Sequence, residues 1–477
     1  IGLNCATGPE FMTDHLRALS ELATCHISVY PNAGLPDENG HYAESPDSLA
    51  QKLSRFVDEG WLNIIGGCCG TSPAHIAAIA KMAAGRQPRK PVTTRRRLVS
   101  GIEPLFIEED ARPILVGERT NVIGSRKFKN MIVAGQFEEA AEIARAQVKT
   151  GAQVIDICVA NPDRDELADM EQMLVYLPKK VRAPIMIDST DAQVTELALQ
   201  RLQGKCVINS INLEDGEERF AKVAPLLRRY GGAVVVGCID EDPQHGMAVT
   251  RSRKLEVAQR SYDLLVNKYG LRPEDLIFDP LVFPVGSGDA SYIGSAVETI
   301  EGVRLITEAF PRCSTILGIS NVSFGLPAAG REVLNAVFLY HCVKAGLGYA
   351  IVNTEKLERY ASIPEEERKL AEDLLFWRGD DPVAAFAAAF RDKKPVSHAP
   401  KAELPLDERL PLYIIEGVKD GLTADLDAAL ARGDKPLEII NGALMAGMAE
   451  VGRLFNDNQL IVAEVLQSAE AMKAAVS

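Results

Sequence analysis

Three cysteines at the ends of apolar runs are the residues of this chain with the clearest capacity for chemistry. Cys5 ends the run "IGLN", and Cys68 and Cys69 follow "LNII" within "LNIIGGCCG". If these runs are parallel strands of one barrel, their ends share one rim and the three thiols can converge. Three thiolates around Zn²⁺ leave one tetrahedral position open for a substrate thiol. The alternatives are that Cys68 and Cys69 are small buried residues or form a strained vicinal disulfide.

A second group of candidates consists of polar residues that come directly after short apolar runs in the middle of the chain. They are Glu118, Asn121, Asp156, Asp188, Asn209, Asp240, Asp279, Ser320, Asn321 and Asn353. Loops and helix caps also need polar residues, and this ordinary role accounts for about half of them. Four follow their runs too closely to cap a later helix and are interpreted as binding residues: Asp188, Asn209, Asp279 and Asn321.

The elements that position these residues alternate between short apolar runs and amphipathic stretches. The apolar runs predict eight strands, at 114–118, 154–158, 185–188, 206–211, 233–239, 276–280, 315–320 and 350–354. The stretches between them place apolar residues at helical spacing and stop at glycine. Eight such units predict an α/β fold of the closed (β/α)8 type, a TIM barrel, whose active site lies at the carboxyl ends of the strands.

Further domains are predicted on both sides of this barrel. Residues 1–84 show three more strand-then-helix units, which we interpret as the C-terminal part of a second (β/α)8 barrel. From about residue 407 only helical patterns follow, which predicts an all-α four-helix bundle. The expected limits are 1–90 for the partial barrel, 91–112 for a linker, 113–390 for the complete barrel, 391–406 for a second linker and 407–477 for the bundle. Because the chain starts in a strand pattern and stops in a helical one, we expect it to be a fragment.

Composition narrows the classes of function. Among 477 residues, 47% are hydrophobic and 25% charged, which is typical of globular domains. The net charge of -14 argues against general nucleic-acid binding, which requires a basic surface. The chain contains neither a signal segment nor an apolar run of the roughly 18 residues that a membrane span needs. Nine scattered cysteines fit a reducing compartment, so we expect a cytoplasmic protein without nucleic-acid or membrane partners.

The cysteine-containing segments resemble the zinc-binding homocysteine module of the cobalamin-dependent methionine synthase family and its homocysteine methyltransferase relatives. The matching stretches are "GLNCATGP", "NAGLPDENGHY" and "GGCCGTSPAHI", which span the last third of that module. The resemblance implies that Cys5, Cys68 and Cys69 are zinc ligands and that zinc activates homocysteine.

The complete barrel resembles the methyltetrahydrofolate module of the same family. The matching stretches are "VGERTNVIGSRKFK", "IMIDST", "VINSIN", "LIFDP" and "GISNVSFG". The resemblance implies a pterin-binding barrel in which carboxylates and amides hold the nitrogen-rich ring of 5-methyltetrahydrofolate. The implied folate-binding residues are Gly124, Ser125, Arg126, Asp188, Asn209, Asp279, Asn321 and Arg331. Two of them, Asn321 and Asp188, are implied to be catalytic.

The barrel also departs from the family pattern at two places. The segment "SFGLPAAG" replaces the common "SFRG", so an arginine that would meet the folate tail is missing. Cys158 replaces the usual asparagine after "DI", which removes one supporting contact. Asp156 and Asp240 are candidates for supporting roles behind the ring-binding residues, and equally for structural loop carboxylates.

Residues 407–477 resemble the helical cobalamin cap of this family. The resemblance implies that Asn441, Phe455 and Val462 contact cobalamin, although leucine is more common at the position of Val462. The alternative for Phe455 is a place in the bundle core. The motif Asp-x-His-x-x-Gly, which carries the lower cobalt ligand, does not occur in this sequence. We therefore expect the cobalamin-binding domain to be missing from this chain.

Together these resemblances imply a cobalamin-dependent methyltransferase. It would transfer a methyl group from 5-methyltetrahydrofolate to cob(I)alamin, and from methylcobalamin to zinc-activated homocysteine, giving methionine and tetrahydrofolate. The implied cofactors are zinc and cobalamin. The alternatives are a pterin-barrel methyltransferase that serves a separate corrinoid protein, a dihydropteroate synthase relative, and a non-catalytic folate- or corrinoid-binding scaffold. The cysteine module and the helical cap argue against the first two.

Overall fold

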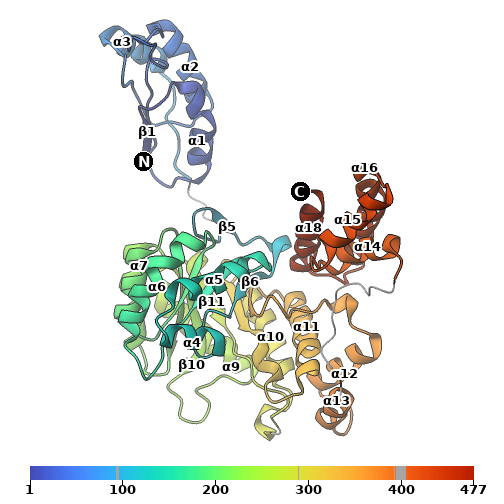
Figure 1. Cartoon of the computed structure of the whole chain (residues 1–477). Helices are drawn as coiled ribbons and strands as arrows, with labels where there is room; N and C mark the ends of the chain where they lie inside the picture. The colour runs from blue at the N-terminus through green and yellow to red at the C-terminus, as the bar shows by residue number, and fades with distance from the viewer. Residues whose placement is uncertain (93–95, 288, 392, 394–403) are drawn as a thin grey trace. The chain divides into compact units, whose positions relative to one another are not determined.

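The computed structural model describes the whole chain except residues 93–95, 288, 392 and 394–403. Two compact units are present, Ile1–Arg95 and Arg96–Ser477 (Figure 1). Most of the linker predicted at 391–406 lies outside the described residues. The domain limits expected from the sequence stay a prediction.

The first unit is a small parallel sheet covered by helices. Its strands are β1 (Gly2–Asn4), β2 (Ser28–Tyr30) and β3 (Ile64–Ile65), in that order across the sheet. Each strand is followed by a helix: α1 (Pro9–Leu22), α2 (Pro46–Asp58) and α3 (Pro73–Ala83). Leu16, Val29, Leu53 and Phe56 form part of the core between the sheet and the helices. Because the strands are parallel, their carboxyl ends lie at one edge, where the three cysteines follow.

The second unit contains a closed barrel of eight parallel strands. The strands are β6 (Ile114–Gly117), β7 (Val154–Ile157), β8 (Ile185–Asp188), β9 (Val207–Leu213), β10 (Ala233–Asp240), β11 (Leu276–Asp279), β12 (Ser314–Gly318) and β13 (Tyr349–Val352). Each pairs with the next along the chain, and β13 pairs with β6 to close the ring. The predicted (β/α)8 barrel is therefore confirmed.

Helices surround the barrel strands. They are α4 (Arg126–Val133), α5 (Phe137–Lys149), α6 (Glu166–Lys180), α7 (Ala192–Arg201), α8 (Glu218–Tyr230), α9 (Arg251–Asp263), which continues as the π-helix η2 (Leu264–Lys268), α10 (Ser295–Ala309) and α11 (Ala328–Lys344), with α12 (Glu365–Leu375) and α13 (Pro382–Phe390) after β13. Alternating side chains of each strand face opposite sides. Ile114 and Val116 belong to the core inside the barrel, whereas Leu115 packs in the cluster that includes residues of α10 and α11.

A hairpin forms within the residues predicted as the first linker. Its strands are β4 (Leu98–Ser100) and β5 (Pro104–Phe106), which pair antiparallel. Val99 joins the core inside the barrel, and the Ser100 and Ile102 N–H groups donate to the Lys205 and Arg182 carbonyls. Lys205 and Arg182 precede β9 and β8, so the hairpin covers the end of the barrel opposite to the strand ends that carry the candidate residues.

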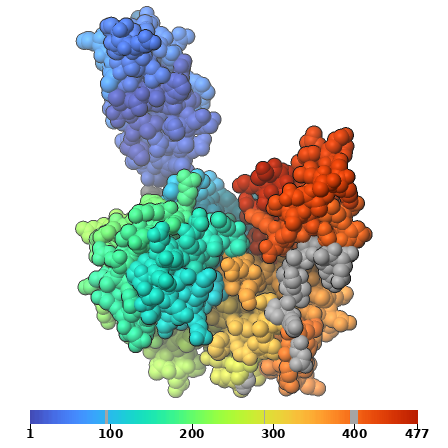
Figure 2. Space-filling view, in the orientation of Figure 1, coloured from blue at the N-terminus to red at the C-terminus, as the bar shows by residue number. Residues whose placement is uncertain are grey.

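The C-terminal residues form helices, as the sequence predicts. The elements are α14 (Leu406–Glu416), α15 (Leu422–Arg432), α16 (Pro436–Ile439), the π-helix η7 (Ile440–Leu444), α17 (Met445–Asn456) and α18 (Val462–Val476). Leu410, Ile414, Leu444 and Ala471 form part of their shared core. These helices form a compact group in the space-filling view (Figure 2).

Arg359, in the loop after β13, connects the barrel to α18. The side chain is buried, and its guanidinium donates to the Glu464 carbonyl at 2.7 Å, to Ser468 Oγ at 2.9 Å and to the Ile415 carbonyl. The Glu464 carboxylate accepts from the Tyr360 N–H at 3.1 Å. Burial raises the pKa of Glu464 to about 7. A buried cation and a buried acid thus lie side by side at this contact.

Replacing Arg359 by methionine is expected to lower the free energy of unfolding by about 3–5 kcal/mol, because it removes the cation beside a buried acid and leaves carbonyl acceptors unpaired. Urea unfolding followed by circular dichroism measures this loss. The control is Arg453→Met, which removes an exposed arginine of α17 that pairs with Glu450 and Asp457 and should change stability little. Equal losses in the two variants would contradict the assignment.

Candidate functional site

The three predicted cysteines converge at one edge of the first unit. Cys5 Sγ lies 3.5 Å from Cys69 Sγ, which lies 4.0 Å from Cys68 Sγ, and all three sulfurs lie within 4.8 Å of one another. A tetrahedral zinc with Zn–S bonds near 2.3 Å separates its sulfur ligands by about 3.8 Å. The observed distances fit such an ion. All three cysteines are free thiols, so the vicinal disulfide that the sequence left open is not formed.

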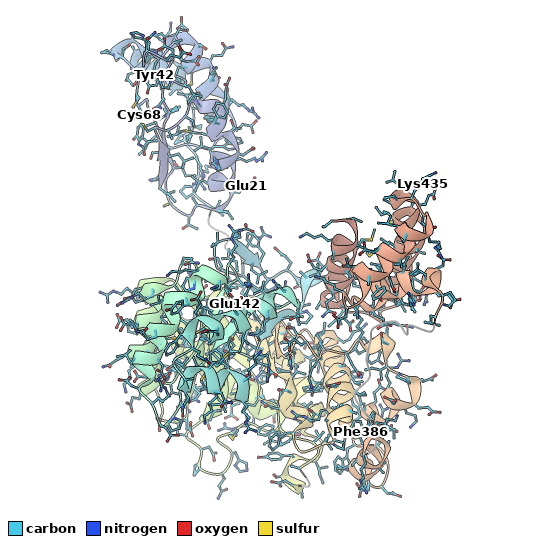
Figure 3. All side chains as sticks on the ribbon, in the orientation of Figure 1. Glu21, Tyr42, Cys68, Glu142, Phe386 and Lys435 are labelled. Atoms are coloured by element: carbon cyan, nitrogen blue, oxygen red, sulfur yellow. The ribbon has the colours of Figure 1, made fainter. Side chains whose placement is uncertain are left out.

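The backbone around the cysteines explains why a glycine follows Cys69. The Cys5 N–H donates to the Tyr30 carbonyl, and the Cys69 N–H donates to Oδ1 of buried Asn32 at 3.2 Å. Gly70 has a φ of +78°, and a Cβ at this position would lie 2.3 Å from the Tyr42 ring. Only glycine fits there. Tyr42 and Cys68 lie in the same region of the first unit (Figure 3).

The electrostatics of the thiol cluster favour a bound cation. The hydrogen bond from the Ala6 N–H, followed by those from Cys69 and Cys68, lowers the pKa of Cys5. The hydrogen bond to Cys5 raises the pKa of Cys69. One thiolate therefore opposes ionisation of its neighbour, and a metal ion among the sulfurs would remove this conflict.

At the carboxyl ends of the barrel strands, four side chains form a connected network. We call Asn121, Asp156, Asp188 and Asn209 the strand-end network. Asn121 Nδ2 donates to Asp188 Oδ2 at 2.9 Å and lies 3.3 Å from Asp156 Oδ2. Asn209 Nδ2 reaches Asp156 Oδ1 at 3.4 Å, and Asn209 pairs with Asp188 in the strand register. The strand register thus places the predicted residues Asp188 and Asn209 side by side, and hydrogen bonds connect them through Asn121 and Asp156, which the sequence did not assign to the ring-binding set.

Burial shifts the acids of this network towards their neutral forms. Burial raises the pKa of Asp188 to about 6. Burial, followed by the charge of Asp188, raises the pKa of Asp156 well above its ordinary value. Like charges that lie close together oppose each other's ionisation, so the charged form of Asp188 favours the protonated form of Asp156. Together with two amides, the network offers both donors and acceptors, which a ring with N–H groups and bare nitrogens requires.

The other two predicted ring-binding residues lie at the ends of neighbouring strands. Asp279 ends β11; its Oδ1 accepts from the Leu281 N–H at 2.8 Å, and burial raises its pKa to about 6. Asn321 lies on the 3₁₀ helix η5 (Ile319–Ser323), so the strand predicted at 315–320 ends earlier, at Gly318. A Cβ at Gly318 would lie 3.1 Å from Asn321 Nδ2. The glycine leaves room for this amide.

The remaining predicted folate-binding residues have different environments. Gly124 and Arg126 are exposed. Ser125 is buried and caps α4, its Oγ accepting from the Phe128 N–H at 3.3 Å. Arg331 donates to Ser323 Oγ at 3.2 Å and to the Ser320 carbonyl, so it supports the turn that carries Asn321. Their contacts with folate stay predictions.

The predicted cobalamin residues lie in the helical region. Asn441, on η7, is exposed, and Val462, the first residue of α18, is half-buried. Phe455 is 42% exposed, so it is not a core residue of the helices. An apolar ring with this exposure remains free to contact a ligand. Binding of cobalamin by these three residues stays a prediction.

Some residues acquire a role only from the structure. Glu118 accepts from Ser320 Oγ at 3.2 Å, and burial raises its pKa. Glu118, like Asn121, comes directly after the first barrel strand. This place in the sequence was the feature that could have indicated a role at the site. Asp240 accepts from Arg253 at 2.7 and 2.6 Å, which identifies it as a structural ion pair.

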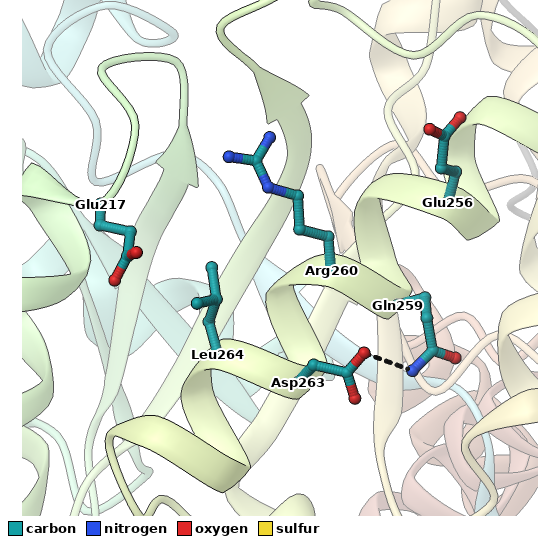
Figure 4. A pocket seen from close by; sticks show the side chains of 6 residues that line it. All are labelled: Glu217, Glu256, Gln259, Arg260, Asp263 and Leu264. Carbon is teal, nitrogen blue, oxygen red and sulfur yellow. Dashed lines mark hydrogen bonds between the residues drawn. The ribbon is translucent and has the colours of Figure 1, made fainter.

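A surface hollow on the outside of the barrel does not involve the predicted residues (Figure 4). It is lined by Glu217, Glu256, Gln259, Arg260, Asp263 and Leu264. Gln259 donates to Asp263 at 3.1 Å, and Arg260 pairs with Glu241. Because its charged groups pair with neighbouring side chains, we assign it no role.

Among the described residues, no helix is long and apolar enough to cross a membrane.

Comparisons with known proteins divide the chain into three matched regions. Residues 1–83 match the homocysteine S-methyltransferase family, residues 117–353 the pterin binding enzyme family, and residues 406–477 the B12 binding domain family. A dihydropteroate synthase structure from Xanthomonas albilineans, with 4-aminobenzoic acid, has a TM-score of 0.41 and 16% identity, covering 60% of this chain and 98% of that one. This overlap is too limited to support an inference.

The B12 match corrects one expectation. The absence of the Asp-x-His-x-x-Gly motif led us to expect that the cobalamin-binding domain is missing. Residues 406–477 match the B12 binding domain family, so a domain of this family is present in the chain. The motif describes only the ligand on the lower side of cobalt. Residues 406–477 form helices and match the B12 family without it, so the absence of the motif did not predict the absence of this domain.

Two curated relatives match the whole chain. The methionine synthase of Mycobacterium tuberculosis (strain ATCC 25618 / H37Rv) is 41% identical, and that of Mycobacterium leprae (strain TN) is 40% identical. Each alignment covers 100% of this chain and 41% of the relative, so the chain spans about two fifths of their length. The chain is therefore similar over its whole length to methionine synthases, and its three parts match a homocysteine S-methyltransferase, a pterin binding enzyme and a B12 binding domain family.

Proposed function

We propose that this chain is the part of a methionine synthase that binds homocysteine and 5-methyltetrahydrofolate and contacts cobalamin. The whole protein would transfer the methyl group of the folate to the corrinoid and then to homocysteine. The observation that supports this most strongly is the presence of two complementary sites in one chain. These are the three-thiol cluster and the strand-end network of the barrel.

In the barrel, the acids and amides would hold the pterin ring and assist departure of its methyl group. Asp188 and Asp279 would accept from the N–H groups of the ring, and Asn209 would both donate and accept. The methyl-bearing nitrogen leaves easily only when it gains positive character, so transfer requires a proton or a strengthened hydrogen bond. Asn321 has no proton to give but can orient this hydrogen bond.

Asp156 is the proposed proton reservoir of the site. Burial, followed by the charge of Asp188, raises the pKa of Asp156 well above its ordinary value, and its carboxyl group lies within hydrogen-bond distance of Asn121 and Asn209. A proton held there can reach the ring through water or through the neighbouring carboxyl of Asp188. The exposed guanidinium of Arg126 would meet the anionic tail of the folate, while Arg331 maintains the turn beneath Asn321.

In the first unit, Cys5, Cys68 and Cys69 would hold zinc. When bound, zinc would supply an open fourth position and lower the pKa of the homocysteine thiol. The chain contributes the orientation of the ligands. Asn32 fixes the Cys69 backbone, and Gly70 permits the sharp turn that places both neighbouring sulfurs on the same side.

In the helical region, the half-exposed Phe455, with Asn441 and Val462, would contact the corrin.

The proposal is tested by mixing the protein with 5-methyltetrahydrofolate and added cob(I)alamin under anaerobic conditions and following the visible spectrum. We expect conversion to methylcobalamin by the unmodified protein. Asn321→Ala should slow it by about 100-fold, because it removes a hydrogen bond made in the transition state. Asn267→Ala, at an exposed amide of η2, is the control. Folate binding without a spectral change would instead support a non-catalytic scaffold.

A further inference from the structure

A lysine is buried completely on the inner face of α9. Lys254 is 0% exposed and shares the buried stripe of this helix with Val257, Ala258 and Ser261. Its Nζ donates to the Ala248 carbonyl at 2.9 Å and to the carbonyls of the two residues that follow Asp279. A buried ammonium is costly unless its donors are paired, and here three carbonyls pair with them.

The carbonyls that Lys254 holds belong to the turn that orients Asp279. Leu281 has a φ of +66°, in the left-handed region that a branched side chain rarely adopts. In this conformation its N–H donates to Asp279 Oδ1 at 2.8 Å. Its carbonyl accepts from Lys254 Nζ at 3.3 Å and from Thr299 Oγ1 at 2.9 Å. Hydrogen bonds from Lys254 of α9 and Thr299 of α10 thus hold Leu281 in an unfavourable backbone conformation.

The surroundings leave the lysine little freedom to move. A Cβ at Gly302 of α10 would lie 2.6 Å from Lys254 Cδ, so the aliphatic stem passes directly over this glycine. The ammonium lies 5.1 Å from the centroid of the buried Phe283 ring. The titratable groups that act on it electrostatically are Cys238 of β10, Asp279 of β11 and Glu298 of α10. Its charge in turn lowers the pKa of Asp279, opposing the effect of burial.

We propose that Lys254 is a positioning residue for the folate site: it holds the Pro280–Leu281 turn so that the Leu281 N–H aligns the Asp279 carboxylate. Lys254 acts through Asp279 and does not touch the ring. The inference rests on the proposed function, because the ligand that Asp279 would bind is a reduced folate. The proposal adds to the folate site a residue, Lys254, that lies on the helix α9 and not at a strand end.

The first test is Lys254→Met, which keeps the length of the stem but removes the charge and the donors. Isothermal titration calorimetry with 5-methyltetrahydrofolate should show about tenfold to hundredfold weaker binding, the effect of losing a charged hydrogen bond that orients a ligand group. Lys222→Met, at an exposed lysine of α8, is the matched control and should bind normally. Unchanged affinity in a folded Lys254→Met protein would overturn the proposal.

The pH dependence of binding separates positioning from a general loss of stability. Asp279 must be ionised to accept from the ring, and without the neighbouring ammonium its pKa rises further. The pH below which folate affinity falls should therefore be higher in Lys254→Met than in the unmodified protein. A variant that is only less stable would keep the original midpoint, and that result would also overturn the proposal.

A measurement without ligand keeps this inference distinguishable from the proposed function. Amide hydrogen exchange of residues 279–283 should become faster in Lys254→Met and in Gly302→Ala, which displaces the same stem, while the exchange of β6 and β7 stays unchanged. If the unmodified protein binds no reduced folate, the proposed function fails, yet the exchange result still tests the turn. Unchanged exchange in a folded Gly302→Ala protein would contradict the role of Lys254 even where Lys254→Met does not fold.

Discussion

The variant Asp188→Asn is expected to be more stable than the unmodified protein at pH 7.5 and to bind reduced folate poorly. Burial raises the pKa of Asp188 to about 6, well above the value near 3.9 of an unfolded aspartate. Above pH 6 the folded protein carries the cost of a buried charge, which asparagine removes. We expect a gain of about 1–3 kcal/mol at pH 7.5, which disappears as the pH falls towards 4, because Asp188 is then protonated in the folded state.

The same variant should lose about 100-fold in folate affinity, because a neutral amide replaces the charged acceptor of a ring N–H. Urea unfolding at pH 7.5 and pH 4 measures the stability change, and calorimetric titration measures the affinity. Asp427→Asn, at an exposed aspartate of α15, is the control and should change neither quantity. A destabilised Asp188→Asn protein with normal affinity would show that Asp188 supports the fold and does not bind the ring.

The second large effect is expected for Cys68→Ser. Loss of one of three thiolate ligands should weaken zinc binding by about 100- to 1000-fold, because a serine hydroxyl stays protonated at neutral pH and is a poor zinc ligand. Zinc content after dialysis against a competing chelator measures this loss. The unmodified protein should retain about one zinc ion per chain, and the variant should retain almost none.

The matched control for the metal experiment is Cys25→Ser. Cys25 is an exposed free thiol of the same unit and lies outside the cluster of Cys5, Cys68 and Cys69. This variant should retain zinc like the unmodified protein. Equal loss of zinc in Cys25→Ser and Cys68→Ser would contradict the assignment, as would full retention by Cys68→Ser.

The barrel could be predicted from the sequence because its information is local. Each strand is a short apolar run. The pleat of a strand makes neighbouring side chains face opposite sides, which places Ile114 and Val116 inside the barrel and Leu115 outside it. Parallel strands also place the residues after them on one rim, which is why Asp188 and Asn209 could be placed together. The cysteine cluster followed from the same rule.

The remaining features depend on contacts between residues far apart in the chain. Lys254 lies on the buried stripe of its helix, but a lysine in an amphipathic stretch is ordinarily exposed, and only the Pro280–Leu281 carbonyls make its burial favourable. The hairpin β4–β5 lies in a segment whose composition resembles a linker, and its position depends on the barrel interior that receives Val99.

By itself the sequence determined the order of strands and helices, the rim on which the polar side chains meet, and the thiols available to a metal. Only the tertiary structure decided that Asn121 joins two acids, that burial raises the pKa of Asp156, and that Arg359 contacts α18. The physical reason is that strand periodicity is a property of neighbouring residues, whereas desolvation and hydrogen bonding depend on which distant groups share the same small volume.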